Sequence, residues 1–473
     1  MKSKNIILFF VISIFAIIQF SLVFINKGLW WDEAIYLGLA ENIRSGFYSL
    51  SLSSPVEAFR APLFPLLSSI LGANPVNVVF SRLIPFLFYS LSIITIYKVG
   101  RKMFSSKEMG LVTGLLITSL PLFIFYSNKF LSESLFVLIF TSSLYLFELN
   151  MKEENGKFAF LLGISLGLSF LTRYIGIILV PLYIIWFTYK EKFRKCFFIL
   201  LGFFTALTPW IIHQHMLFGN PLWGFLSNFK IYTTMTSKSF LYYIVNSYDI
   251  FGPLTIVIFF GYLVSLKDLF FQNLKGNEKF ILILSLFIPF ILTIMGNKNI
   301  RYLVSFYPIF CLLAALTLFR VKRYGTKVYN FLIVLIVLLS IGSFYAGYDR
   351  VLKDRDSGLA LKEAGLYVKE NTGNEEIIMT QIYSSHYPEW NISSNNPWIR
   401  VIGGRKTIPF PENKDDLKET IKKYDIKYVL VYNFGPIVPE YSKEIIENKE
   451  FVEIKTFNQW NYEKAAVIYK YQP

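Results

Sequence analysis

The sequence is poor in cysteine, histidine and charged residues. Its 473 residues include two cysteines and three histidines, and 17% are charged, against about 25% in an ordinary soluble domain. Cys196 and Cys311 both lie inside apolar runs, which excludes a disulfide framework and a cysteine metal site. His213 and His215 have no third ligand at metal spacing, so a zinc site is not expected at these histidines.

Apolar residues make up 54% of the chain and are concentrated in long runs. This distribution excludes a soluble globular enzyme, a disordered chain and a small secreted scaffold. A membrane span needs about 20 apolar residues. About eleven runs are candidates, near residues 6–25, 78–98, 109–127, 130–149, 158–172, 174–189, 196–213, 250–266, 280–296, 302–319 and 328–346, and the pair on either side of Arg173 is short. The first run follows Lys2 and Lys4, is long and lacks a small-residue cleavage site, so it is expected to be a retained span rather than a signal peptide.

Basic residues are concentrated in alternate loops between these runs, for example in residues 98–107, 190–195 and 320–327. If the N-terminus is cytoplasmic, every such loop faces the cytoplasm, as the positive-inside rule requires. The net charge of +15 therefore reflects membrane topology to a large extent. Recognition of nucleic acid would need a clustered basic face with a binding motif. The sequence shows neither, and no nucleic-acid partner is expected.

Eleven spans place the C-terminus outside the cytoplasm, and the composition changes sharply after about Tyr345. We therefore expect a membrane domain over residues 1–348 and a soluble extracytoplasmic α/β domain over residues 349–473. In the latter, charge and apolar alternation predict helices and strands. The expected helices cover 356–371 and 411–424, and the expected strands cover 376–380, 399–402, 426–432, 451–457 and 465–471.

Two long outer loops are expected, near residues 26–77 and 214–248. The first contains Trp30-Trp31-Asp32-Glu33 directly after the first span, followed by apolar residues at the spacing of an amphipathic helix on the membrane surface. Two interpretations of Asp32 and Glu33 stay open. They are an acidic pair that stabilises a helix N-terminus, or they provide a carboxylate that takes a proton from an acceptor hydroxyl at the membrane boundary.

Other ionisable residues are expected at the same boundary. Glu133 begins the fourth run, Arg173 separates two short runs, Arg301 begins the tenth run, and Arg60 lies in the first outer loop. Taken singly, the arginines would contact lipid headgroups and Glu133 would be a cap or snorkelling residue. Taken together, they form a set in which arginine forks could clamp a phosphate.

The order of these features resembles the GT-C glycosyltransferases, in particular the branch that includes protein O-mannosyltransferases and the aminoarabinose transferases of lipid A. The resemblance covers residues 1 to about 320. The matching segments are Trp31-Asp32-Glu33, Arg60-Ala61-Pro62-Leu63, Glu133, Leu171-Thr172-Arg173, Pro209-Trp210 with Phe218-Gly219-Asn220-Pro221, and Arg301-Tyr302 with Pro308. The family often has two prolines where this chain has Ala61-Pro62.

The resemblance implies transfer of a sugar from a polyprenyl-phosphate carrier to an extracytoplasmic protein, lipid or glycan, usually with inversion. It implies that Asp32 is the general base, with Glu33 its acidic neighbour, and that Glu133 faces the sugar or the acceptor. The substrate-binding residues that it implies are Arg60 and Arg301 at the donor phosphate, with Arg173, Tyr302 and Asn220. Some GT-C branches need a divalent metal, and the sequence leaves this requirement open.

Three alternatives stay open. A transporter or flippase of lipid-linked glycans would have broken helices near mid-membrane and an internal repeat. The sequence shows no repeat, and its ionisable residues gather near one boundary. A glycan ligase or polymerase would share the basic outer residues without needing the Asp32-Glu33 pair. A non-catalytic membrane protein with a partner-binding soluble domain would leave the polar first loop unexplained.

Overall fold

The computed structural model describes residues 2–50, 59–153, 155–234, 238–271, 274–322, 325–381, 396–411, 413–433, 450–459 and 462–472. The chain divides into two compact units. The membrane unit comprises residues 1–23, 58–64 and 83–352, and the α/β unit comprises residues 24–57, 65–82 and 353–473. The α/β unit therefore combines the C-terminal part of the chain with two segments from the first long outer loop.

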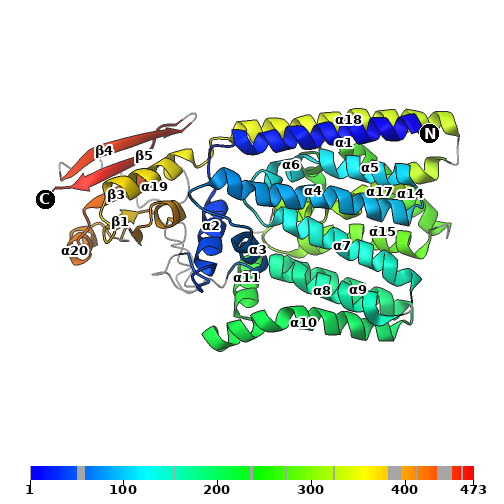
Figure 1. Cartoon of the computed structure of the whole chain (residues 1–473), viewed down its shortest axis with the longest axis horizontal. Coiled ribbons are helices and arrows are strands. Elements are labelled where there is room, and N and C mark those ends of the chain that lie inside the picture. Colours follow the sequence, from blue (N-terminus) through cyan, green and yellow to red (C-terminus); the bar gives the residue numbers. More distant parts are fainter. Residues whose placement is uncertain are drawn as a thin grey trace. The chain divides into compact units, whose positions relative to one another are not determined.

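The described secondary-structure elements of the membrane unit are all helices (Figure 1). Four of the helices, α1, α3, α4 and α18, cross a unit boundary. The elements are α1 (Lys2–Ile25), α3 (Leu63–Ile70), α4 (Val78–Met103), α5 (Lys107–Ser119), α6 (Pro121–Ser127), α7 (Glu133–Lys152), α8 (Gly156–Thr172), η1 (Tyr174–Ile178), α9 (Leu179–Tyr189), α10 (Phe193–Phe218), α11 (Trp223–Thr234), α12 (Tyr242–Val245), α13 (Ser247–Phe251), η2 (Gly252–Leu254), α14 (Thr255–Phe270), α15 (Gly276–Ile294), α16 (Arg301–Val304), α17 (Tyr307–Val321) and α18 (Thr326–Asp354).

Among the described residues, seven helical segments are long and apolar enough to cross a membrane: Lys4–Ile25, Val78–Met103, Glu133–Lys152, Phe193–Phe218, Ser247–Phe270, Gly276–Ile294 and Thr326–Asp354. Helices α5 and α6 pass the same test only as a pair, bent by 66° where Pro121 begins α6. Three shorter apolar helices cover Gly156–Thr172, Tyr174–Tyr189 and Tyr307–Val321. All eleven runs expected from the sequence fall on these segments.

Close contacts hold two pairs of neighbouring helices together in the membrane unit, α1 with α18 and α8 with α10. Helices α1 and α18 lie side by side (Figure 1). Phe15 stacks on Phe344 with 4.1 Å between the ring centroids, and the Lys4 ammonium donates a hydrogen bond to the Asn330 side chain. Since both contacts advance in the same direction along the two helices, the helices run parallel. Between α8 and α10, a Cβ atom on Gly163 would lie 2.0 Å from the Ile199 carbonyl oxygen, so no larger residue fits there. Such small residues let apolar helices approach closely in a membrane. The α8–α10 contact positions the end of α8, where Arg173 lies.

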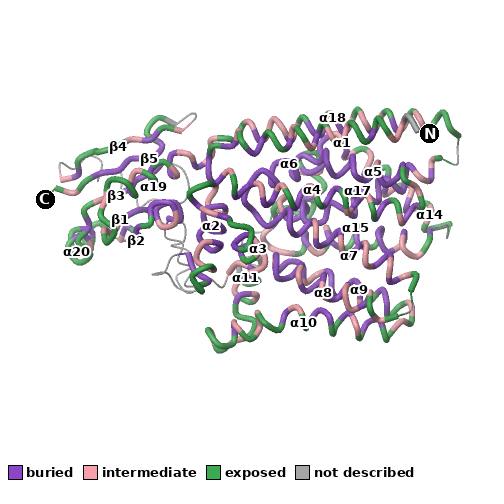
Figure 2. The backbone as a smooth tube through the Cα atoms, viewed as in Figure 1, coloured by how far each residue is buried: buried purple, intermediate pink, exposed green. Residues whose placement is uncertain are grey.

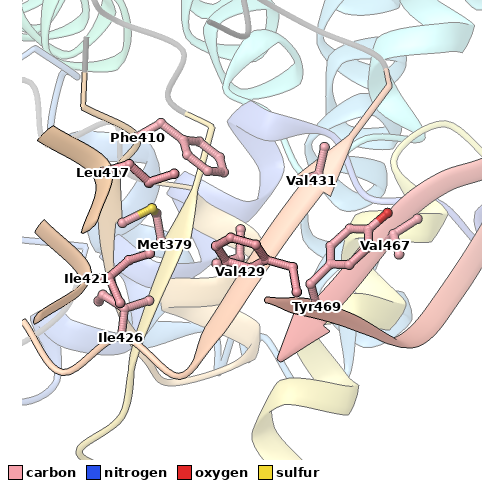
Figure 3. Packing of buried hydrophobic residues seen from close by; sticks show 10 residues of the cluster. Met379, Phe410, Leu417, Ile421, Ile426, Val429, Val431, Val467 and Tyr469 are labelled. Carbon is pink, nitrogen blue, oxygen red and sulfur yellow. The ribbon is translucent and has the colours of Figure 1, made fainter. Parts of the chain in front are cut away.

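The α/β unit contains a five-stranded sheet with the order β2-β1-β3-β5-β4. Its elements are α2 (Trp31–Ile43), α19 (Leu359–Asn371), β1 (Ile377–Thr380), η5 (Trp398–Ile402), β2 (Lys406–Pro409), α20 (Asp416–Lys423), β3 (Tyr428–Tyr432), β4 (Phe451–Gln459) and β5 (Tyr462–Tyr471). Strand β1 is parallel to β2 and β3, whereas β5 is antiparallel to β3 and β4. Figure 3 shows the core between the sheet and α20, which includes Met379, Leu417, Ile421 and Val429.

One expected strand is wrong. Residues Ile399–Ile402 belong to the short π-helical segment η5, and the edge strand β2 beside β1 is Lys406–Pro409. A short apolar run fits a buried helix as well as a buried strand, so periodicity alone cannot separate them. The Arg400 side chain donates to the Thr407 hydroxyl at 2.9 Å and to the Thr407 carbonyl at 3.1 Å, which joins the π-helical turn to β2.

Candidate functional site

Three of the predicted site residues meet in the membrane unit. Glu133 is the first residue of α7, Arg173 follows the last residue of α8, and Arg301 is the first residue of α16. Both guanidinium groups contact the same carboxylate oxygen, Oε1 of Glu133. The Glu133 side chain is fully buried, whereas the Arg173 and Arg301 side chains are 12% and 18% exposed. We call these three residues the Glu133 cluster.

The geometry of the Glu133 cluster follows from helix direction. Helices α7 and α16 begin where α8 ends, so the three side chains lie at one end of the bundle. Two guanidinium groups and one carboxylate give a net charge of about +1. The second carboxylate oxygen, Glu133 Oε2, is buried and accepts no hydrogen bond from the described residues. The cluster can therefore bind an anion through the arginines and a hydrogen-bond donor through Oε2.

An aromatic ring adjoins the cluster, and a buried lysine lies close to Glu133 in the chain. The Arg301 guanidinium lies over the Tyr126 ring, 5.4 Å from its centroid. Lys129 precedes Glu133 by four residues, is 1% exposed, and holds its ammonium group 5.6 Å from the Phe125 ring centroid. Lys129 was not among the residues predicted from the sequence. The available signal was a lysine in the short polar step between two apolar runs.

Glu33 has a structural role that the sequence left open. Its carboxylate accepts two hydrogen bonds from Arg82, at 2.8 and 2.9 Å, and both side chains are fully buried. Glu33 also accepts a hydrogen bond of 2.9 Å from the Trp30 backbone N–H at the start of α2. Arg82 further donates to the carbonyls of Asn26 and Gly28, at 2.6 and 2.5 Å. Glu33 therefore caps α2 and fixes the chain before it.

Asp32 lies in the first turn of α2 and is partly exposed, beside the fully buried Glu33. Residues Glu33 to Ala40 are buried without a break, so α2 is packed on more than one face (Figure 2). The two neighbouring carboxyl groups therefore differ in environment. The Glu33 carboxylate is buried and paired with Arg82, whereas the Asp32 side chain is partly exposed to solvent.

The segment that carries Asp32 is fastened within the α/β unit. The Trp30 indole N–H donates to Asp354 Oδ2 at 2.8 Å, and the Trp398 indole N–H donates to the Leu29 carbonyl at 2.8 Å. Trp31 meets Trp398 edge to face, with 5.3 Å between ring centroids. Element η5 and the residues around Asp354 thus hold the start of α2.

Lys362 of α19 adds a further contact to this segment. Its ammonium group donates to the Lys27 carbonyl at 3.1 Å. Burial lowers the pKa of Lys362, and the positive charge of Arg82 lowers it further, against the opposing effect of Glu33. The Lys362 ammonium is thus held near the Arg82–Glu33 pair at an electrostatic cost.

The other predicted site residues are placed as follows. Arg60 is partly buried, with its guanidinium 5.7 Å from the Phe59 ring centroid. Tyr302 is 9% exposed and follows Arg301 in α16. Asn220 Oδ1 accepts a hydrogen bond of 2.9 Å from the Leu222 N–H, which is a turn contact. The described residues contain no group of three or more His, Cys, Asp or Glu side chains arranged to hold a metal ion.

A family model described as dolichyl-phosphate-mannose-protein mannosyltransferase matches residues 62–213, which include Glu133 and Arg173. No curated protein matches the chain. Several solved structures do. ArnT from Cupriavidus metallidurans, bound to undecaprenyl phosphate, superposes with a TM-score of 0.73 at 11% identity, over 98% of this chain and 97% of ArnT. The same protein in the apo state gives a TM-score of 0.72 at 12% identity, with the same coverage.

The oligosaccharyltransferase of Archaeoglobus fulgidus, solved with Zn and sulfate, gives a TM-score of 0.62 at 16% identity, over 89% of this chain and 68% of that one. At such identities the likeness is one of fold. The chain is therefore a polytopic helical membrane protein with the fold of the GT-C glycosyltransferases and a small C-terminal sheet domain, as the sequence predicted. Its fold is similar to that of ArnT, and residues 62–213 match the protein mannosyltransferase family model.

Proposed function

We propose that this protein transfers a sugar from a polyprenyl-phosphate carrier to an acceptor outside the cytoplasm, with inversion at the anomeric carbon. Two comparisons support a lipid-linked donor. The ArnT structure with the same fold over almost the whole chain holds undecaprenyl phosphate, and the matching family model is named for dolichyl-phosphate-mannose. The observation that carries the proposal is the Glu133 cluster, which combines two arginines with a buried carboxylate at one end of the helix bundle.

The chemistry needs two things from the protein, positive charge at the leaving group and a base for the acceptor. Displacement at an anomeric carbon passes through an oxocarbenium-like state. The leaving group is a phosphate, so charge neutralisation helps its departure more than protonation does. Arg173 and Arg301 of the cluster, with Arg60, would supply that charge through bidentate contacts. An acceptor hydroxyl then needs a base on the opposite face of the sugar.

Asp32 is assigned as that base. Asp32 is the partly exposed member of the acidic pair. Both oxygens of Glu33 already accept hydrogen bonds, from Arg82 and from the Trp30 N–H at the start of α2. A positioned carboxylate typically contributes about 10²–10⁴-fold to a rate through general base catalysis.

The assignment predicts a large and specific loss of turnover in Asp32→Asn. Purified protein in lipid would be given radiolabelled polyprenyl-phosphate sugars together with a membrane extract as the acceptor source. We expect transfer by the wild type and a fall of about 10²–10⁴-fold in kcat for Asp32→Asn, with little change in donor affinity. Asp425→Asn is a matched control, because its carboxylate is 89% exposed in the α/β unit.

Undiminished transfer by Asp32→Asn would remove Asp32 from the mechanism. Movement of intact donors across the bilayer without sugar transfer, measured in the same vesicles, would favour the transporter alternative over the transferase.

A further inference from the structure

We propose that Arg350 is a further binding residue for the carrier phosphate, and that Asp249 is its internal competitor, which pairs with Arg350 whenever the phosphate is absent. The inference rests on the proposed function and adds two residues to it. Neither residue was among those predicted from the sequence. The packing of α18 against α6 and α13, together with the geometry of the ion pair, provides the evidence.

Helix α18 lies against α6, the short helix that ends beside the Glu133 cluster (Figure 1). A Cβ atom on Gly347 of α18 would lie 3.0 Å from the Pro121 Cα, so the two backbones touch at this point. Arg350 is three residues beyond Gly347 and therefore on the same face of α18. The charge of Arg350 acts on the phenol of Tyr126, the residue whose ring lies under Arg301. Arg350 thus adjoins the cluster.

A second contact brings α13 to the same face of α18. The Ser343 hydroxyl donates a hydrogen bond of 3.1 Å to the Phe251 carbonyl and accepts one of 3.2 Å from the Leu254 N–H. Ser343 and Arg350 are seven residues apart, which is two turns of helix, so they share one face. Phe251 is the last residue of α13, and Asp249 lies two residues before it. The contact therefore places Asp249 against the face of α18 that carries Arg350.

The ion pair between Arg350 and Asp249 is long and open to solvent. Arg350 Nη2 and Asp249 Oδ1 are 3.8 Å apart, and the two side chains are 34% and 56% exposed. Exposed pairs of this kind contribute little to stability. A guanidinium group binds a phosphate more strongly, because its planar fork donates two parallel hydrogen bonds. A phosphate that reaches Arg350 would therefore displace Asp249 at little cost.

An exchangeable partner serves both the binding and the release of the carrier. The Glu133 carboxylate that Arg173 and Arg301 contact is fully buried, and breaking a buried pair is costly. Asp249, by contrast, can leave Arg350 when the donor binds and return when the carrier leaves. The released carrier is a phosphomonoester with a charge of about −1.5 to −2 at neutral pH, whereas the donor phosphodiester carries about −1. An arginine holds the released carrier more tightly, and a competing carboxylate limits this product inhibition.

The first test measures binding without turnover. Undecaprenyl phosphate, the lipid held in the ArnT structure, is titrated into the purified full chain in neutral detergent, and native mass spectrometry gives the dissociation constant. Undecaprenol, which lacks the phosphate, is the reference ligand. We expect Arg350→Gln to weaken binding of undecaprenyl phosphate by at least about tenfold, because charge-assisted hydrogen bonds are lost. Binding of undecaprenol should not change.

Asp249→Asn should have the opposite effect and strengthen binding by about two- to fivefold, because it removes the competing carboxylate. A purely structural ion pair would be broken by either substitution, and both variants would then change binding in the same direction. Arg350→Lys keeps the charge but loses the planar fork, so its affinity should lie between those of the wild type and Arg350→Gln. Arg355→Gln is the matched control, since Arg355 is an exposed arginine that pairs with its neighbour Asp356. It should bind as the wild type does.

The second test follows inhibition of sugar transfer by added undecaprenyl phosphate. The inhibition constant should fall by about two- to fivefold in Asp249→Asn and rise by at least about tenfold in Arg350→Gln. Changes in the same direction for the two variants, or wild-type affinity in Arg350→Gln, would overturn the inference and leave the proposed function in place. A wild-type protein that binds undecaprenyl phosphate no better than undecaprenol would overturn both.

Discussion

The buried pair of Arg82 and Glu33 is the residue-scale feature with the clearest energetic consequence. Both side chains are fully buried and are joined by two hydrogen bonds. Glu33→Gln would leave the Arg82 charge without its counter-ion, and breaking a buried pair in this way typically costs about 3–5 kcal/mol. We expect a loss of that size in the free energy of unfolding, measured by denaturant titration of the purified protein in detergent.

A double variant that removes both charged side chains serves as the control for Glu33→Gln. Replacing both partners together, as Arg82→Met with Glu33→Leu, removes the uncompensated ion. It also removes the hydrogen bonds to the Asn26 and Gly28 carbonyls and to the Trp30 N–H, so it should recover only part of the loss. Glu41→Gln, in the partly buried last turns of α2, should have a small effect, because burial already raises the pKa of Glu41 and disfavours its charge. A Glu33→Gln protein as stable as the wild type would contradict the prediction.

The sequence identified the residues that gather at the candidate site, but it did not indicate which of their side chains contact one another. It singled out Glu133, Arg173 and Arg301 as polar residues at one boundary, since helix direction places the ends of alternate spans at one level. It did not indicate that both arginines contact one oxygen of Glu133. Nor could it pair Glu33 with Arg82, because that contact depends on how the chain before α2 folds back.

At the scale of elements, the start of α2 depends on a close backbone contact. Gly358 precedes α19 with φ of +76°, and a Cβ atom there would lie 2.1 Å from the Leu29 carbonyl oxygen. Gly404 also has a positive φ, +63°, but a Cβ atom would meet nothing within 4 Å. Backbone strain alone costs about 1–2 kcal/mol per residue, and steric overlap adds about 1–3 kcal/mol.

We therefore expect Gly358→Ala to lower the free energy of unfolding by about 1–3 kcal/mol more than Gly404→Ala, because only Gly358 combines strain with overlap. Denaturant titration of the two variants measures the difference. Transfer activity should also fall in Gly358→Ala, since Leu29 lies three residues before Asp32. Equal free energies of unfolding for the two alanine variants would show that the close approach of Gly358 to the Leu29 carbonyl does not contribute to stability.

Elements were predictable where one pattern dominates. Each of the eleven apolar runs falls on a helical segment, because an apolar run of span length is satisfied in a membrane by a helix. The sequence did not indicate the 66° bend at Pro121 or the π-helical form of Trp398–Ile402. The bend lies where Pro121 begins α6. The π-helical form is held by tertiary contacts, among them the Trp398 indole bond to the Leu29 carbonyl and the Arg400 bonds to Thr407.

At the scale of the whole molecule, the number of spans and the direction of helices are linked. Helices α1 and α18 run parallel, as the first and last members of an odd number of spans must. The basic loops assign the start of both helices to the cytoplasm under the positive-inside rule. The α/β unit would then lie outside, on the side where the proposed transfer takes place.

This orientation predicts which engineered cysteines react with a membrane-impermeant maleimide in intact cells. Lys418 is exposed in α20, and Lys157 is exposed at the start of α8, in a loop assigned to the cytoplasm. The native cysteines, Cys196 and Cys311, are buried and give little background. Lys418→Cys should be labelled at once, whereas Lys157→Cys should be labelled only after permeabilisation. The reverse result would place the α/β unit, and Asp32 with it, in the cytoplasm. Asp32 could then not act as the base for an acceptor outside the cytoplasm.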